Sequence, residues 1–207
     1  MTKSNTIIEL KKQGVVAVIR GTSYEEGHQT ATACIKGNLK AIEIAYTNNN
    51  ADMIIKQLSS DYQNNNAGTV LDAPTAKNAI MAGAKYIVSP AFNQETAIIC
   101  NRYGIPYIPG CMTIKEIITA MEYGCEIIKL FPGSAFGPNY INAIKGPLPY
   151  VSLMVTGGVN LNNAAEWFNA GIDAIGIGGE LNKLAAKGQF ETIKEIAQKY
   201  VNTKTRK

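Results

Sequence analysis

The sequence is poor in the residue types that hold metals and cofactors. It contains one histidine, His28, and its four cysteines, Cys34, Cys100, Cys111 and Cys125, show no CxxC spacing. A structural zinc or a haem needs a cluster of such ligands. The sequence therefore predicts no metal site and no cofactor, and we expect the four thiols to be reduced, buried packing residues of an intracellular protein.

Long apolar runs and a strong charge bias are also missing. No apolar stretch approaches the length of a bilayer span, and the amino terminus lacks the apolar core of a signal peptide. We therefore expect a cytoplasmic protein with no membrane segment. The net charge of +4 comes from 20 Lys and Arg against 16 Asp and Glu, and the basic residues are scattered apart from the final KTRK. This pattern does not indicate a partner that is a nucleic acid.

What the chain does contain is a regular alternation of short apolar runs with amphipathic segments. A length of 207 residues with 46% hydrophobic residues suits one domain, over residues 1–207. The apolar runs, rich in valine and isoleucine, occupy 15–19, 40–46, 67–70, 85–89, 106–110, 126–131, 151–158 and 173–179. Eight strands alternating with helices predict an α/β fold, a closed (β/α)8 or TIM barrel. An open doubly wound sheet is the weaker alternative, because no GxGxxG follows the first run.

The segments between the apolar runs carry helix signals. Many of them end on a glycine, which is common just after a helix. Thr113 and Glu116 have the spacing of a capping box, and Asn160 is expected to cap the helix that runs through Trp167. Extra amphipathic helices are expected before the first strand, at 5–13, and after the last, at 191–201.

Lys129 stands inside the apolar run EIIKLF and raises the first functional question. Strand alternation places it on one face with Ile127 and Phe131, while Ile128 and Leu130 take the other face. A buried ammonium is costly, and burial favours the neutral amine, which can attack a carbonyl. The alternative is a lysine at a strand end that extends its amine to solvent.

Glu43 occupies the same kind of position in the run AIEIA. The small side chains Ala41 and Ala45 share its face, so a ligand or Lys129 has room to approach the carboxylate. A buried acid and a buried amine in one barrel favour a Schiff-base enzyme, in which the carboxyl group moves protons between steps. A structural ion pair remains the alternative.

Polar residues and glycines at other strand ends complete the candidate site. TGG at 156–158 and GIGG at 176–179 end the last two strands, where barrels commonly bind phosphate, although such glycines also occur for steric reasons. The backbone N–H groups of Gly178 and Gly179 would face that anion. Arg20 closes the first strand and Thr69 the third, and both can hold a substrate carboxylate or act as a surface residue or a helix cap.

These motifs together resemble one known family. VVAVIRG, AIEIAYT, AGTV, YIVSP, YIPG, EIIKLFPG, VTGGVN and IGIGG follow the order and spacing of the 2-dehydro-3-deoxy-phosphogluconate and 4-hydroxy-2-oxoglutarate aldolases over essentially the whole chain. The resemblance implies a metal-independent class I aldolase on a (β/α)8 barrel. It also implies a homotrimer that cleaves a 2-keto-3-deoxy sugar acid to pyruvate and an aldehyde.

The resemblance also assigns expected roles to individual residues. Lys129 resembles the imine-forming lysine and Glu43 the general acid and base. The other positions resemble substrate-binding residues: Arg20 and Thr69 for the pyruvate carboxylate, Pro90 and Phe131 for the site wall, and Gly157, Gly158 and Gly178 for the phosphate.

The sequence departs from this family pattern at two places. Many members have TLR after the glutamate, where this chain has Ala45-Tyr46-Thr47, so Arg20 is expected to replace the family's arginine. Many members also have a serine after the last glycine of the eighth strand, where this chain has Gly179-Glu180. Two other functions remain open from the sequence, namely a phosphate-binding barrel isomerase that uses Glu43 as its base, and a non-catalytic barrel that binds a keto acid.

Overall fold

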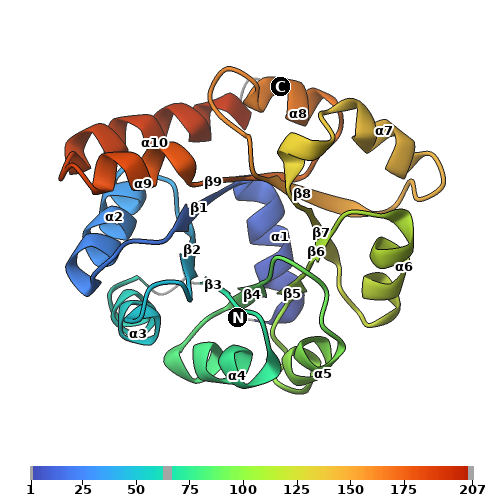
Figure 1. Ribbon diagram of the computed structural model, residues 1–207, viewed down its shortest axis with the longest axis horizontal. Helices are drawn as coiled ribbons and strands as arrows, with labels where there is room; N and C mark the ends of the chain where they lie inside the picture. The colour runs from blue at the N-terminus through green and yellow to red at the C-terminus, as the bar shows by residue number, and fades with distance from the viewer. Residues whose placement is uncertain (1, 63–66, 205–207) are drawn as a thin grey trace.

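Strands and helices alternate along the chain of the computed structural model, which describes residues 2–62 and 67–204 (Figure 1). The strands are β1 (Val15–Ile19), β2 (Ala41–Ala45), β3 (Ala67–Thr69), β4 (Tyr86–Val88), β5 (Tyr107–Ile108), β6 (Gly110–Cys111), β7 (Ile127–Leu130), β8 (Ser152–Thr156) and β9 (Ala174–Ile177). The helices are α1 (Lys3–Gln13), α2 (Tyr24–Lys36), α3 (Ala51–Asp61), α4 (Ala73–Ala82), α5 (Gln94–Arg102), α6 (Ile114–Glu122), the 3-10 helix η1 (Gly133–Ala135), α7 (Asn139–Lys145), α8 (Ala164–Asn169), α9 (Gly179–Ala185) and α10 (Phe190–Lys204).

The parallel strands close into a barrel through one interrupted strand. Their order in space is β5-β4-β3-β2-β1-β9-β8-β7-β6, and the two ends, β5 and β6, are separated in the chain by Pro109 alone. The Ile108 carbonyl accepts from the N–H of Ser89, the residue after β4 (3.2 Å), and the Pro109 carbonyl accepts from Lys129 N–H on β7 (2.9 Å). Residues 107–111 therefore act as one strand between β4 and β7. The fold is the expected (β/α)8 barrel, and proline interrupts the strand because it has no N–H to donate.

Two separate apolar layers hold the barrel together. Side chains that point inward form a small core, which consists of Ile7, Leu10, Val16, Ala41, Tyr86, Val88, Ile108, Ile127, Met154 and Ala174. The alternate strand residues, such as Ile42, Ile128 and Val155, pack outward against the ring of helices in a much larger core. Because successive strand side chains point to opposite faces, each strand is buried on both sides.

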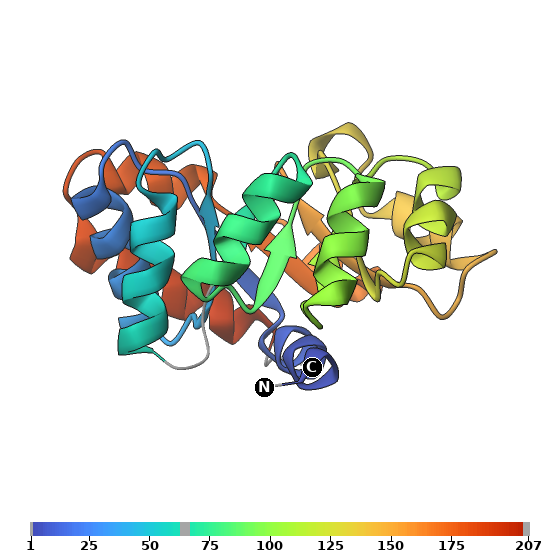
Figure 2. The same ribbon diagram turned by 90° about the horizontal axis from the view of Figure 1, so that it is seen from below.

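Helix α1 closes one end of the barrel (Figure 2). Its Ile7 and Leu10 belong to the inner core, so the helix covers the ends at which the strands begin. The helix begins at Lys3, earlier than expected, because the Thr2 hydroxyl accepts from Asn5 N–H (3.3 Å) and caps it. The opposite end, where the strands finish, is left for ligands.

Two helix starts test the capping predictions. The capping box at α6 is confirmed, since Thr113 accepts from Glu116 N–H (3.3 Å) while the Glu116 carboxylate accepts from Thr113 N–H (2.9 Å). The prediction for Asn160 was wrong, because α8 begins at Ala164 and its N-cap is Asn163. The Asn160 side chain instead accepts from Asn162 N–H (2.9 Å) and stabilises the turn before the helix.

The four cysteines behave as predicted. Each is buried and unpaired, and burial raises the pKa of each thiol to about 12. Across residues 2–62 and 67–204, the helices are too short or too polar to cross a bilayer.

Candidate active site

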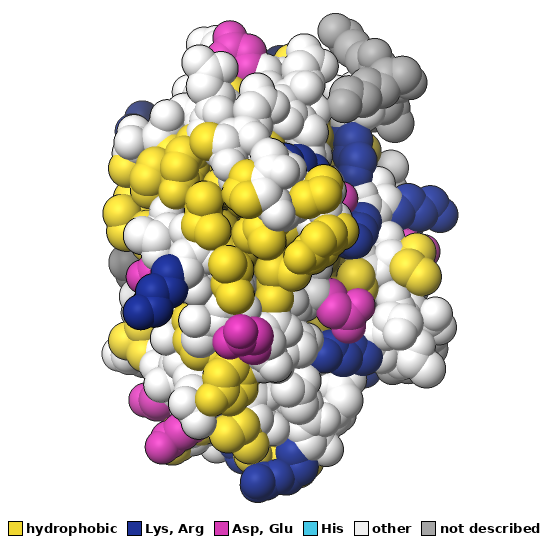
Figure 3. Space-filling model, turned by 90° about the vertical axis from the view of Figure 1, so that its right-hand side faces the viewer, with side chains coloured by type: hydrophobic (Ala, Val, Ile, Leu, Met, Phe, Trp, Pro, Cys, Tyr) yellow, Lys and Arg dark blue, Asp and Glu magenta, His cyan; other side chains and the backbone are white. Residues whose placement is uncertain are grey.

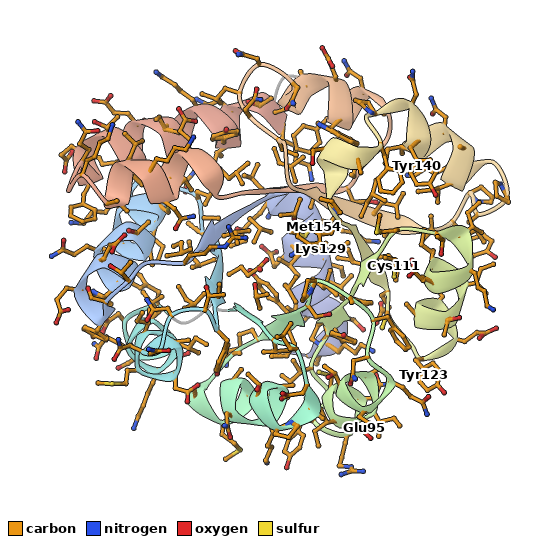
Figure 4. All side chains as sticks on the ribbon, viewed as in Figure 1. Glu95, Cys111, Tyr123, Lys129, Tyr140 and Met154 are labelled. Atoms are coloured by element: carbon orange, nitrogen blue, oxygen red, sulfur yellow. The ribbon has the colours of Figure 1, made fainter. Side chains whose placement is uncertain are left out.

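Lys129 and Glu43 meet inside the barrel near the ends at which the strands finish. The Lys129 amine lies 3.6 Å from Oε1 of Glu43, and the two side chains are 3% and 0% exposed. Figure 4 shows Lys129 beside Met154, its partner in the register of β7 with β8, in the middle of the barrel. The alternative in which Lys129 extends to solvent is therefore excluded, since strand alternation directs this side chain inward as predicted.

The neighbours of Lys129 fix its strand and its amine. Its N–H is bonded to the Pro109 carbonyl, and its register partner on β6 is Gly110. A Cβ at position 110 would lie 2.0 Å from the Pro90 carbonyl oxygen, so a glycine here allows the loop with Pro90 to close over the site. The amine also lies 5.1 Å from the centre of the Phe131 ring, a cation–π contact.

The two oxygens of Glu43 have different surroundings. Oε1 receives a hydrogen bond from the Thr69 hydroxyl and faces Lys129. Oε2 is buried without a hydrogen-bond partner in the part of the chain that the structure describes. A buried carboxylate oxygen that lacks a partner is costly, and this one is available to a ligand hydroxyl or a water.

A cavity of about 370 Å³ opens above this pair. The residues that line it include all the candidates expected from the first seven strands, namely Arg20, Glu43, Thr69, Pro90, Lys129 and Phe131. Its volume suits a small organic ligand. Below it, Tyr86 donates to the Ile42 carbonyl (2.9 Å), and burial together with the charge of Glu43 raises the pKa of Tyr86 and keeps the phenol neutral.

A second cavity, of about 300 Å³, adjoins the first, and Arg20 and Phe131 line both. Its wall contains the four predicted glycines Gly157, Gly158, Gly178 and Gly179. Gly157 and Gly158 have φ values of 93° and 81°, a region that favours glycine. A Cβ at Gly178 would lie 2.6 Å from the Val18 carbonyl oxygen. The structure thus brings all ten predicted residues around two connected cavities.

Sequence reasoning missed two residues of the site. Thr156 lines both cavities, and its hydroxyl is buried with no hydrogen-bond partner among the described residues. It stands in the TGG motif, of which we singled out only the glycines. Tyr46 lines the first cavity, and its hydroxyl donates a hydrogen bond to the Asp52 carboxylate. Burial, followed by the hydrogen bond and charge of Asp52, raises the pKa of Tyr46, so the phenol stays neutral.

Metal ligands do not gather in the same way. Within residues 2–62 and 67–204, no three or more His, Cys, Asp or Glu side chains form a group that could hold a metal ion. The polar groups that line the first cavity include the amine of Lys129, the carboxylate of Glu43 and the hydroxyls of Thr69 and Thr156.

The fold and the site together define a (β/α)8-barrel enzyme with a buried amine and carboxylate beneath its cavity. The profile of the family described as KDPG and KHG aldolase matches residues 7–196. The 2-dehydro-3-deoxy-6-phosphogalactonate aldolase of Escherichia coli K12 is 33% identical over 174 residues, which are 82% of this chain and 85% of the relative. The 2-dehydro-3-deoxy-phosphogluconate aldolase of Treponema pallidum is 34% identical over 167 residues, which are 78% of this chain and 79% of the relative.

A solved structure agrees with these relatives. The structure described as native KDPGal superposes with a TM-score of 0.86 at 30% identity, over 92% of this chain and 94% of its own. The chain belongs to the KDPG and KHG aldolase family. It is an aldolase, a lyase, and the predicted family and fold are confirmed.

Proposed function

We propose that the chain, as one barrel domain over residues 1–207, cleaves a 2-keto-3-deoxy-6-phospho sugar acid to pyruvate and glyceraldehyde 3-phosphate. The observation that carries the proposal is the ion pair of Lys129 and Glu43, 3.6 Å apart and almost fully buried beneath a ligand-sized cavity. A lysine in this setting can form an imine with a ketone, because the adjacent carboxylate can accept the proton that the ammonium loses before it attacks.

The reaction begins at the C2 ketone of the substrate. Glu43 takes one proton from the Lys129 ammonium, the amine adds to C2, and Glu43 returns that proton to the oxygen that leaves as water. The product is a protonated imine that withdraws electrons from the C3–C4 bond. Glu43 accepts the proton of the C4 hydroxyl, directly or through a water, and its unpartnered Oε2 is the oxygen in position to do so. The C3–C4 bond breaks, and its electrons form an enamine on Lys129 while C4 becomes the aldehyde carbon.

The second half of the reaction returns the enzyme to its starting state. The enamine carbon takes up the proton that Glu43 carries, which regenerates the imine. Water then adds to C2, replaces the water lost earlier, and releases pyruvate and the Lys129 amine in its protonated form. Thr69 orients Glu43 through its hydrogen bond to Oε1. It can bind the substrate carboxylate, as the sequence predicts, only by giving up that bond.

The two cavities suit the two charged ends of such a substrate. Arg20 lines both, and its guanidinium supplies the charge for the keto acid's carboxylate at the strand ends. The second cavity is lined by Gly157, Gly158, Gly178 and Gly179, whose backbone N–H groups would bind the phosphate. Pro90 and Phe131 form an apolar wall of the first cavity, beside the reacting carbons.

The configuration of the substrate at C4 defines two closely related candidates. The phosphogluconate and phosphogalactonate derivatives differ at that carbon and give the same two products. Relatives named for each of them match this chain at 34% and 33% identity. Among the described residues, the hydroxyl of Thr156 has no hydrogen-bond partner, and it lines both cavities, so it can donate to the reacting part of the substrate.

Pyruvate release from a panel of substrates tests the proposal. The panel contains both 6-phosphorylated acids, their unphosphorylated forms and 4-hydroxy-2-oxoglutarate, each assayed with the purified chain. We expect one of the phosphorylated acids to give the highest kcat/KM. No pyruvate from any of the five compounds would rule the proposed reaction out.

An apolar surface supports the further proposal of a homotrimer. Figure 3 shows hydrophobic side chains gathered over the side on which Figure 1 places α6. Met112 and Ile118 are 43% and 40% exposed, and Tyr140 donates to the Met112 carbonyl (3.0 Å). Such a patch favours self-association, and light scattering of the parent and of Ile118→Glu would measure it.

Free buried thiols accord with the cytoplasmic location that the sequence predicts.

A further inference from the structure

The side-chain amide of Asn182, near the start of α9, joins the end of β1 to the loop that follows β9. Its Oδ1 accepts from Arg20 N–H (2.9 Å), and its Nδ2 donates to the Val18 carbonyl (2.9 Å) and to the Gly178 carbonyl (2.6 Å). Both acceptors and the donor are backbone groups of the substrate-facing end of the barrel. The side chain is therefore fully engaged in holding backbone, and none of these contacts is to another side chain.

The position of these bonds shows what the amide replaces. Strands β1 and β9 pair in register from Val15 with Ile175 to Ala17 with Ile177, and the chain then leaves the sheet at Gly178. A parallel partner of Ile19 would donate its N–H to the carbonyl of residue 18 and accept from the N–H of residue 20. Asn182 makes these two bonds with its side chain. It thus extends the β1–β9 ladder after the backbone of β9 has turned away.

Arg20 is the residue that this extension holds. It is the first residue after β1, its side chain is exposed, and it lines both cavities. Without the bond from Asn182, the Arg20 N–H would lose its acceptor, and the backbone from which the guanidinium extends would lose its fixed position. The loops on which Arg20 and Gly178 stand would also lose the amide that connects them.

We propose that Asn182 is a positioning residue, which holds Arg20 where its guanidinium meets the carboxylate of the keto acid. The inference rests on the proposed function, since it assumes that Arg20 binds that carboxylate. Asn182 itself is not among the residues that line either cavity. Its loss should therefore weaken ligand binding and leave the imine-forming step intact once the site is filled.

Pyruvate isolates this effect, because it has the carboxylate and the ketone and no phosphate. The experiment measures the rate at which sodium borohydride traps pyruvate on Lys129 as a function of pyruvate concentration. The variants are Asn182→Ala, Asn182→Asp, Arg20→Ala and the double variant with alanine at both positions. Asn101→Ala is the matched control, because Asn101 also donates to a backbone carbonyl, that of Tyr123 (2.9 Å), at the opposite end of the barrel.

Asn182→Ala should raise the half-saturating pyruvate concentration about 10-fold, with the maximal trapping rate unchanged, as expected for lost binding of one charged group. Arg20→Ala should raise it at least as much, and the double variant should match Arg20→Ala, because residues that act through one contact are not additive. Asn182→Asp keeps an acceptor for Arg20 N–H but has no N–H to donate to the Val18 and Gly178 carbonyls, so it should also raise the half-saturating concentration. The control should equal the parent.

Four results would overturn the inference. These are an unchanged half-saturating concentration in Asn182→Ala, effects that multiply in the double variant, an Asn182→Asp that equals the parent, and an unimpaired Arg20→Ala. If any of these results is found while the parent still forms the trapped adduct, the proposed aldolase reaction remains supported. No adduct in the parent would instead contradict the proposed function itself, and the inference with it.

Discussion

Tyr200 on α10 donates a hydrogen bond to the carboxylate of Glu180 across 3.5 Å. Glu180 follows the glycines of the second cavity and stands close to the place at which many family members have a serine. The bond turns its carboxylate toward α10, and Glu180 is absent from the residues that line the cavity. Burial, followed by the charge of Glu180, raises the pKa of Tyr200, so the phenol remains a donor.

This orientation predicts a preference for phosphorylated substrate. Repulsion between a carboxylate and a phosphate about 4 Å apart would weaken phosphate binding by some 1–4 kcal/mol, depending on the local dielectric. A carboxylate that faces α10 avoids this repulsion and leaves the glycine N–H groups available to the phosphate. We expect kcat/KM for the 6-phosphorylated acid to exceed that for the unphosphorylated acid, both in the parent and in Glu180→Ser. A preference for the unphosphorylated acid in the parent that reverses in Glu180→Ser would place Glu180 in the site.

Borohydride trapping distinguishes the aldolase from the isomerase and the binding barrel that the sequence leaves open. In the presence of pyruvate and sodium borohydride, the parent should lose activity and gain the mass of one reduced pyruvyl group, on Lys129. Peptide mapping by mass spectrometry locates the adduct, and Lys129→Ala is the control that should gain none. An adduct on another lysine, or none in the parent, would contradict the imine mechanism.

Glu43→Gln separates proton transfer from imine formation. The amide keeps the size of the side chain but cannot accept the C4 proton, so kcat should fall by roughly 10²–10⁴ while the pyruvate adduct still forms on Lys129. Glu126→Gln is a matched control, because Glu126 pairs with Lys3 (3.7 Å) on the exposed surface. A Glu43→Gln enzyme with parental turnover would return Glu43 to the role of a structural ion-pair partner.

The buried cysteines give a prediction about pH. Burial raises the pKa of each thiol to about 12. A raised pKa lowers the fraction of reactive thiolate at every pH below it, so the native chain should resist alkylation by iodoacetamide at pH 8. After denaturation all four cysteines should react within the same time, as counted by intact mass. Rapid labelling of any one of them in the native chain would show that its site opens to solvent.

Local patterns in the sequence predicted most of the barrel. The apolar runs located every strand, because a strand covered on both faces is apolar along its length. The capping box at Thr113 and Glu116 was also readable, since its bonds join residues three apart. The prediction for Asn160 failed because its side chain accepts from Asn162 N–H within the turn, and the helix begins only after Asn163, whose side chain accepts from Asn160 N–H.

Some residues of the candidate site could likewise be predicted from local patterns in the sequence, and others could not. Lys129 and Glu43 could be found from the sequence, because a charged residue in an apolar strand conflicts with its surroundings and marks the position. Thr156 and Asn182 could not, since a threonine in a strand and an asparagine in a helix agree with their local patterns. Their importance comes from partners remote in the chain, as when Asn182 bonds Arg20 and Val18 of β1.

The sequence by itself determined the alternation of strands and helices, the face of β7 that carries Lys129, and the glycines of the second cavity. Each of these follows from interactions between residues close in the chain. The tertiary structure decided which groups meet: the 3.6 Å approach of Lys129 to Glu43, the closure of the barrel at Pro109, and the orientation of Glu180 toward Tyr200. These depend on how a closed sheet and its helices bring distant segments together, which periodicity and local propensity do not encode.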